Sequence, residues 1–156
     1  MRKLLLFSLL ALSLHTAANA QINVGNAVNT VSNATGNKVS ASGLLTQLAG
    51  GIASGSYTSQ WAAAKNTWTS NANKVTTAAG AAQVLGQLAG YIKPEAFGSN
   101  WSALKNNWTS GLKTVNTMQQ VGTSIKTLVG GLNNNAFTSS FLSNKNNYLA
   151  ALSLLK

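Results

Sequence analysis

The feature that most constrains this chain is a pattern of residues that recurs three times, 40 positions apart. An aromatic residue opens the pattern, a second follows four positions later, a lysine eight positions later and a third aromatic residue eleven positions later. The three copies are Tyr57-Trp61-Lys65-Trp68, Phe97-Trp101-Lys105-Trp108 and Phe137-Phe141-Lys145-Tyr148. A repeat of about this length is typical of a pair of helices that cannot bury its apolar face alone.

Each repeat begins with a short apolar segment. In the first copy Leu44, Leu45, Leu48 and Ile52 recur at the spacing of one helix face, which is inconsistent with the strict alternation of a strand. The corresponding segments are 84–92 and 124–132. A glycine near the end of each segment either ends the helix in a left-handed cap or lets two helices approach closely; these are Gly50, Gly90 and Gly130.

A polar connector follows, and then a longer amphipathic helix whose apolar residues step by three and four. The predicted longer helices cover 57–75, 97–115 and 137–155. Pro94 and Glu95 lie in the second connector, where they suit the first turn of a new helix because a missing N–H costs nothing there and a negative charge is favoured.

Upstream of the first copy, the apolar positions between Val24 and Ala34 indicate a weaker helix that caps one end. The sequence therefore predicts an all-α fold in a compact stack or bundle. It comprises an N-terminal capping segment, 21–42, and a domain, 43–156, of three tandem helix-turn-helix repeats. Each repeat of about 40 residues holds a short and a long helix; the repeats are 43–82, 83–122 and 123–156.

Residues 1–20 have the pattern of a Sec-type bacterial signal peptide. Arg2 and Lys3 precede an apolar run, and Ala18-Asn19-Ala20 supplies the small residues that signal peptidase recognises. We expect an exported mature chain that begins at Gln21, lacks a transmembrane segment and resides in the periplasm, on the outer surface or outside the cell.

The residues after Ala20 offer few groups for chemistry. Two of the 11 basic residues lie in the leader, which leaves nine lysines and one acid, Glu95, with no Cys, His, Asp or Arg. General acid–base catalysis needs a group that titrates near neutrality or a pair of carboxylates, and metal sites need His, Cys or clustered acids. We therefore expect no enzyme activity, no disulfide, no metal and no cofactor, and we interpret Glu95 as a helix-start residue.

The lysine of each pattern lies on one side of its helix between two aromatic residues. On a functional interpretation, lysines flanked by aromatic planes recur at a regular translation along the stack and bind a periodic anionic polymer. The candidate polyanion-binding residues are Lys65, Lys105, Lys145, Lys74 and Lys113. On the structural interpretation, which we favour, the lysine stem packs across aromatic core residues. That predicted core comprises Tyr57, Trp61, Trp68, Phe97, Trp101, Trp108, Phe137, Phe141 and Tyr148.

Two functions follow as hypotheses. The first is a non-enzymatic binding or scaffolding protein of the cell envelope or extracellular matrix, with polysaccharide, lipopolysaccharide, extracellular DNA or a protein assembly as partner. The alternative is a secreted cationic, membrane-active protein of the bacteriocin or toxin kind, because lysine and tryptophan on one helix favour interfacial binding.

Overall fold

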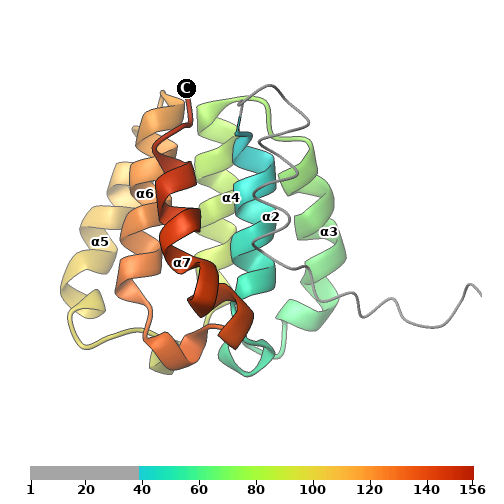
Figure 1. The fold of residues 1–156 in the computed structure, drawn as a ribbon, viewed down its shortest axis with the longest axis vertical. Helices are drawn as coiled ribbons and strands as arrows, with labels where there is room; N and C mark the ends of the chain where they lie inside the picture. The colour runs from blue at the N-terminus through green and yellow to red at the C-terminus, as the bar shows by residue number, and fades with distance from the viewer. Residues whose placement is uncertain (1–38) are drawn as a thin grey trace, which may run out of the picture.

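The computed structural model describes residues 39–156, and this part of the chain is all-helical (Figure 1). The α-helices are α2 (Ala41–Gly51), α3 (Trp61–Asn73), α4 (Ala78–Gly90), α5 (Trp101–Leu112), α6 (Met118–Gly131) and α7 (Ser139–Leu152). Three short 3₁₀ helices are η1 (Ser54–Ser56), η2 (Pro94–Ala96) and η3 (Asn134–Ala136). The predicted all-α class is confirmed. The predicted capping helix between Val24 and Ala34 lies outside the described residues; of the capping segment 21–42, residues 39–42 are described, and residues 41 and 42 belong to α2.

The helices are arranged as a central trio covered by an outer trio. Helices α2, α4 and α6 contact one another, and each outer helix lies over a seam between two of them. Helix α3 contacts α2 and α4, α5 contacts α4 and α6, and α7 contacts α6 and α2. In Figure 1, α3 and α5 flank the central helices on opposite sides and α7 crosses in front. The last helix thus returns to the first.

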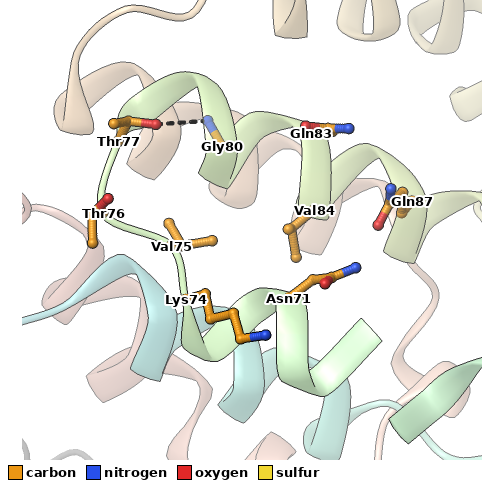
Figure 2. A pocket seen from close by; sticks show the side chains of 9 residues that line it. All are labelled: Asn71, Lys74, Val75, Thr76, Thr77, Gly80, Gln83, Val84 and Gln87. Atoms are coloured by element: carbon orange, nitrogen blue, oxygen red, sulfur yellow. Dashed lines mark hydrogen bonds between the residues drawn. The ribbon is translucent and has the colours of Figure 1, made fainter. Parts of the chain in front are cut away.

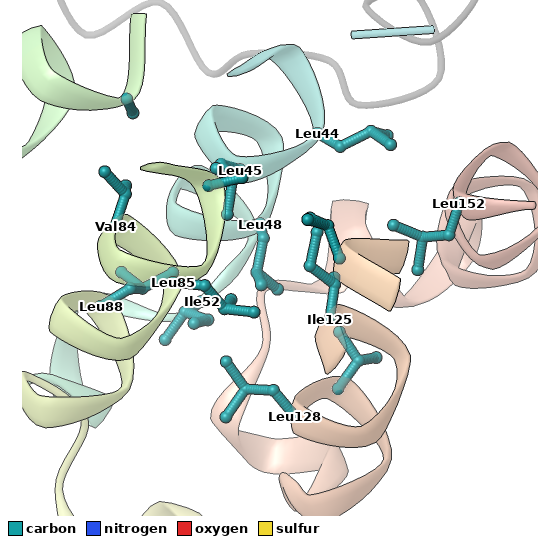
Figure 3. Packing of buried hydrophobic residues seen from close by; sticks show 14 of the residues in the cluster. Leu44, Leu45, Leu48, Ile52, Val84, Leu85, Leu88, Ile125, Leu128 and Leu152 are labelled. Atoms are coloured by element: carbon teal, nitrogen blue, oxygen red, sulfur yellow. The ribbon is translucent and has the colours of Figure 1, made fainter. Parts of the chain in front are cut away.

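The central helices supply most of the aliphatic core. Side chains of α2, α4 and α6 converge between the helices, as Figure 3 shows. Among those with almost no exposed surface are Leu44, Leu45, Leu48, Leu85, Leu88, Val121, Ile125, Leu128 and Val129. Burying one such side chain stabilises the folded state by roughly 1.5–3 kcal/mol relative to leaving it in water.

The connections that follow the central helices are joined to one another. Antiparallel bridges pair Tyr57 with Ile92, Phe97 with Leu132, and Phe137 with Ile52. Backbone hydrogen bonds of 2.9 Å accompany them, donated by Lys93 to Ser56, by Asn133 to Ala96 and by Ala53 to Ala136. These connections lie at the lower end of the bundle in Figure 1. Each connection is therefore bonded to the other two, and the connection after α6 pairs with the connection after α2.

The predicted alternation of short and long helices is wrong. Helices α4 and α6 have 13 and 14 residues, as many as the outer helices α3 and α7. They begin six residues before the apolar segments because Thr77 and Thr117 act as N-caps, accepting hydrogen bonds from the amides of Gly80 and Gln120. In α4 the added residues include buried alanines, Ala78, Ala81 and Ala82, which are too small to mark an apolar stripe in the sequence.

The outer helices begin later than predicted. Tyr57 has extended backbone angles (φ −93°, ψ 151°), and α3 starts only at Trp61. The first aromatic residue of each pattern instead stacks on the second, with ring centroids 4.5, 4.7 and 4.9 Å apart in the three copies. Pro94 and Glu95 do open a helix, but it is the single turn of η2 and not the outer helix.

The predicted glycines do not form left-handed caps beyond the helices, and a Cβ at Gly90 or Gly130 would meet no neighbour within 4 Å. Gly50, Gly90 and Gly130 all lie within helices. The close approaches occur one residue later: a Cβ at Gly51 would overlap the ring of Phe141, and one at Gly131 would overlap the ring of Trp101. The two glycines therefore make room for an aromatic side chain of a neighbouring outer helix.

Candidate functional site

The nine aromatic side chains of the repeated pattern lie mostly in the interior. Eight are buried: Tyr57, Trp61, Trp68, Trp101, Trp108, Phe137, Phe141 and Tyr148. Phe97 is half-buried. Within each copy the second and third rings meet edge-on or tilted, with centroids 5.1–5.6 Å apart. Rings enclosed in this way leave little face for stacking a sugar or a base.

The third aromatic residue of each copy also donates a hydrogen bond across the bundle. Trp68 Nε1 donates to the carbonyl of Val84, and Trp108 Nε1 donates to that of Ser124, both at 2.9 Å. The hydroxyl of Tyr148 donates to the carbonyl of Leu44 at the same distance, although 104 residues separate them. An outer helix is thereby bonded to the next central helix, and the last outer helix to the first.

The candidate lysines lie outside this core. Lys65, Lys74, Lys105 and Lys113 are exposed. Lys145 is half-buried, with its Nζ 5.0 Å from the centre of the Phe137 ring, which is the snorkelling arrangement that a lysine beside core aromatics adopts. The prediction of lysines repeated by translation along a stack is wrong. Because α7 returns to α2, the lysines of α3, α5 and α7 are distributed around a closed bundle.

Two of the candidate lysines border hollows in the surface. Lys74 lies in a cleft of about 320 Å³ between the end of α3 and the start of α4. Figure 2 shows Asn71, Gln83 and Gln87 in the same cleft, together with Thr77 and its hydrogen bond to Gly80. Amide groups around one ammonium group match a ligand rich in hydroxyl and anionic oxygen atoms.

Lys105 borders a larger groove of about 730 Å³ between α4 and α5. Glycine and alanine of α4 form one wall, and the indoles of Trp101 and Trp108 form part of the other. Thr58 also lines this groove, and its hydroxyl is buried without a hydrogen-bond partner among the described residues. The groove is therefore apolar along most of its length and carries a charge at one place.

Sequence reasoning missed both hollows. The repeated pattern identified Lys105 and its flanking tryptophans, but a groove depends on what is missing from the opposite helix. Two glycines of the second copy, Gly86 and Gly98, line this groove, and the first and third copies have larger residues at the corresponding positions. A position-by-position comparison of side-chain size among the three copies would have identified these two glycines.

Two further observations bear on the chemistry. Residues 39–156 contain no group of three or more His, Cys, Asp and Glu side chains that together could hold a metal ion. The same residues include no helix that is both long and apolar enough to span a bilayer.

Comparisons with protein families, with characterised proteins and with solved structures found no match to this chain.

Proposed function

We propose that residues 43–156 are three tandem helical units, 43–82, 83–122 and 123–156, related by an approximate three-fold rotation. The support comes from positions 40 apart that make the same interaction. Hydrogen bonds from residues 68, 108 and 148 reach carbonyls at 84, 124 and 44, and the bridges between connections follow the same cyclic order. On this view the units close on themselves instead of extending as an open array.

We propose further that the chain is an exported, non-enzymatic protein that binds or scaffolds at the cell envelope or in the extracellular matrix. Its partners on this proposal are anionic polymers: polysaccharide, lipopolysaccharide or extracellular DNA. The observation that carries the proposal is the imbalance of surface charge. Eight of the nine lysines after Ala20 lie in residues 39–156, where Glu95 is the one acid. Such a surface attracts polyanions from any direction.

The burial of the aromatic side chains supports an electrostatic mode of binding over a stacking mode. Trp68 and Trp108 are 2% and 9% exposed, so contacts to a polymer fall to the ammonium groups. If about three lysines contact phosphates, the logarithm of the binding constant falls with the logarithm of salt concentration at a slope of about −2 to −3.

Retention on heparin and DNA resins across a salt series tests this proposal. We expect retention at low salt and release by a few hundred millimolar salt. Replacing Lys65, Lys105 and Lys145 together by Gln should shift elution to lower salt and reduce the slope. A single replacement, Lys74→Gln, gives the contribution of the cleft in Figure 2. Absence of retention at low salt would rule out polyanion binding and leave scaffolding alone.

The membrane-active alternative remains the second proposal, and the same burial counts against it. The tryptophans of the protein are buried and cannot insert into a lipid surface while the fold is intact. The exposed large apolar side chains of the described residues are Leu104, Leu142 and Leu154. Dye release from vesicles that contain anionic lipid distinguishes the two. Rapid release at micromolar protein would favour the alternative, and intact vesicles would discard it.

A further inference from the structure

The groove between α4 and α5 differs from the rest of the surface in being largely apolar. It has a volume of about 730 Å³, within the range of about 300–1,000 Å³ that small-molecule sites occupy. Its α4 wall includes Gly86, Ala89 and Gly90, and its α5 wall includes Trp101, Trp108 and Leu112. Backbone-like helix surface thus faces indole and leucine side chains, which leaves room for the body of an apolar ligand.

The sequence around this groove departs from the other two copies in ways that open it. Position 86 is glycine where the corresponding residues are Thr46 and Lys126. Gly98 likewise stands where the other copies have threonine. Phe97 is half-buried, although its counterparts Tyr57 and Phe137 are each only 5% exposed. The groove therefore coincides with small residues that the second copy alone has at positions 86 and 98.

The charge of the lining limits the ligand further. Lys105 is the only charged residue among those that line the groove, and the single acid of the described residues, Glu95, is not among them. A ligand with a long apolar body would bury that body along the walls, and a single negative group on it would lie near the ammonium group of Lys105. We propose that this groove binds a small amphiphilic anion, an acyl chain that ends in a carboxylate.

This site shares Lys105 with the proposed polymer binding, but polymer binding also uses lysines on the other sides of the bundle. The groove takes one small molecule, and most of the binding free energy comes from apolar surface removed from water. Its affinity for the ligand should therefore depend weakly on salt, whereas polymer binding depends on salt strongly.

Isothermal titration of the chain from Gln21 onward with sodium decanoate, below its critical micelle concentration, tests the proposal. We expect saturable binding of one decanoate per chain. Decanol, which lacks the charge, should bind about two- to fivefold more weakly, since a partly exposed ion pair contributes up to about 1 kcal/mol. Decyltrimethylammonium should bind more weakly still. Equal affinity for all three would overturn the role of Lys105.

Two pairs of matched variants locate the site. Gly90 lines the groove, and Gly130 is the corresponding residue of α6, away from it. A Cβ added at either position would meet no neighbour within 4 Å, so Gly90→Leu and Gly130→Leu differ mainly in whether the new side chain fills the groove. We expect Gly90→Leu to weaken decanoate binding by about tenfold or more and Gly130→Leu to leave it unchanged. Lys105→Gln should weaken binding about two- to fivefold, and Lys65→Gln should not.

The outcomes separate this proposal from the proposed function. Gly90→Leu should retain the heparin elution of the unmodified chain, because it removes no charge. Non-saturable heats, or equal losses in Gly90→Leu and Gly130→Leu, would overturn the groove proposal whatever the heparin result.

Discussion

At the scale of single residues, Tyr148 shows how a polar atom is accommodated in this core. Its side chain is fully buried, and its hydroxyl finds a partner in the backbone carbonyl of Leu44. A buried hydroxyl without such a partner would cost about 1–3 kcal/mol. The position thus needs a residue that is both aromatic and able to donate, and tryptophan fulfils the same need at positions 68 and 108.

We predict that Tyr148→Phe lowers the free energy of unfolding by about 1–2 kcal/mol, because the apolar packing remains while the hydrogen bond is lost. Tyr91→Phe is the control, since the hydroxyl of half-buried Tyr91 makes no hydrogen bond among the described residues; its effect should stay below about 0.5 kcal/mol. Urea denaturation measures both. Equal effects would show that the Tyr148 bond contributes little.

The same burial predicts a loss of stability at alkaline pH. Burial raises the pKa of Tyr57 and Tyr148 well above the ordinary value of 10.0, since the charged phenolate would be removed from water. Their contribution to stability is therefore fully present below pH 10. Above it, the unfolded chain releases protons that the folded chain retains, and stability falls by about 1.4 kcal/mol per pH unit for each tyrosine.

Urea midpoints measured between pH 8 and 11 check this expectation. Stability should begin to fall near pH 10, and the fall should be shallower in the double variant Tyr57→Phe/Tyr148→Phe, even though that variant is less stable at pH 8. Parallel curves for the two proteins would mean that these tyrosines ionise in the folded state as they do in water.

At the scale of helices, adjacent glycines of α6 have opposite surroundings. Gly130 has open space where a Cβ would lie, whereas a Cβ on Gly131 would overlap the six-membered ring of Trp101. Trp101 is itself stacked on Phe97 and in contact with Trp108, so it has little freedom to move away. Adding the same methyl group at the two positions therefore separates helix propensity from packing.

We predict that Gly131→Ala destabilises the domain by about 1–3 kcal/mol through overpacking against Trp101. Gly130→Ala should stabilise it by about 0.5–1 kcal/mol, because alanine has the higher helix propensity. Thermal and urea unfolding of the two variants, side by side, provide the measurement. A stabilising Gly131→Ala would mean that the indole shifts at no cost.

Helices were the part of this structure that the sequence predicted best. Leucines at helical spacing identified the central helices, and large aromatics at intervals of seven identified the outer ones. Their starts were missed for two physical reasons. Threonine N-caps start α4 and α6 six residues before the predicted segments, and in α4 the added residues are mostly alanines too small to mark an apolar stripe. The bridges at Tyr57 and Phe97 hold those two residues in extended conformation before the outer helices begin.

At the scale of the molecule, the return of α7 to α2 could not be read from the repeat. A spacing of 40 residues is compatible with translation or rotation between units, because a repeat in the sequence does not specify the angle between one unit and the next. The contacts that close the bundle, such as Tyr148 with Leu44 and Phe137 with Ile52, join residues that are far apart in the sequence. The groove beside Lys105 was missed for a related reason, since it depends on how α4 faces α5.

The closure predicts that the chain tolerates new ends. Figure 1 places the C-terminus and the start of α2 at the same end of the bundle. A circular permutant of residues 39–156 that joins Lys156 to Val39 through a short Gly/Ser linker, with new ends between Val75 and Thr76, should retain its helical circular dichroism. We expect it to lose no more than about 2 kcal/mol of stability.

A second permutant, cut within α4 between Leu85 and Gly86, is the control, because this break divides a buried helix. It should fail to unfold cooperatively. If both permutants lose their helicity, the contact between α7 and α2 is too weak to hold the ends together.

The return of the last helix to the first also has a consequence for growth. An open array can gain a unit by duplication, since each new copy stacks on an uncovered end face. Within residues 39–156 that face is already taken: α2 is covered by α6 and α7, and α6 by α4, α5 and α7. A fourth copy would have to separate α7 from α2 before it could be inserted. If the three units are arranged as proposed, a fourth copy therefore cannot be added at an end of residues 39–156 without first breaking the contact between α7 and α2.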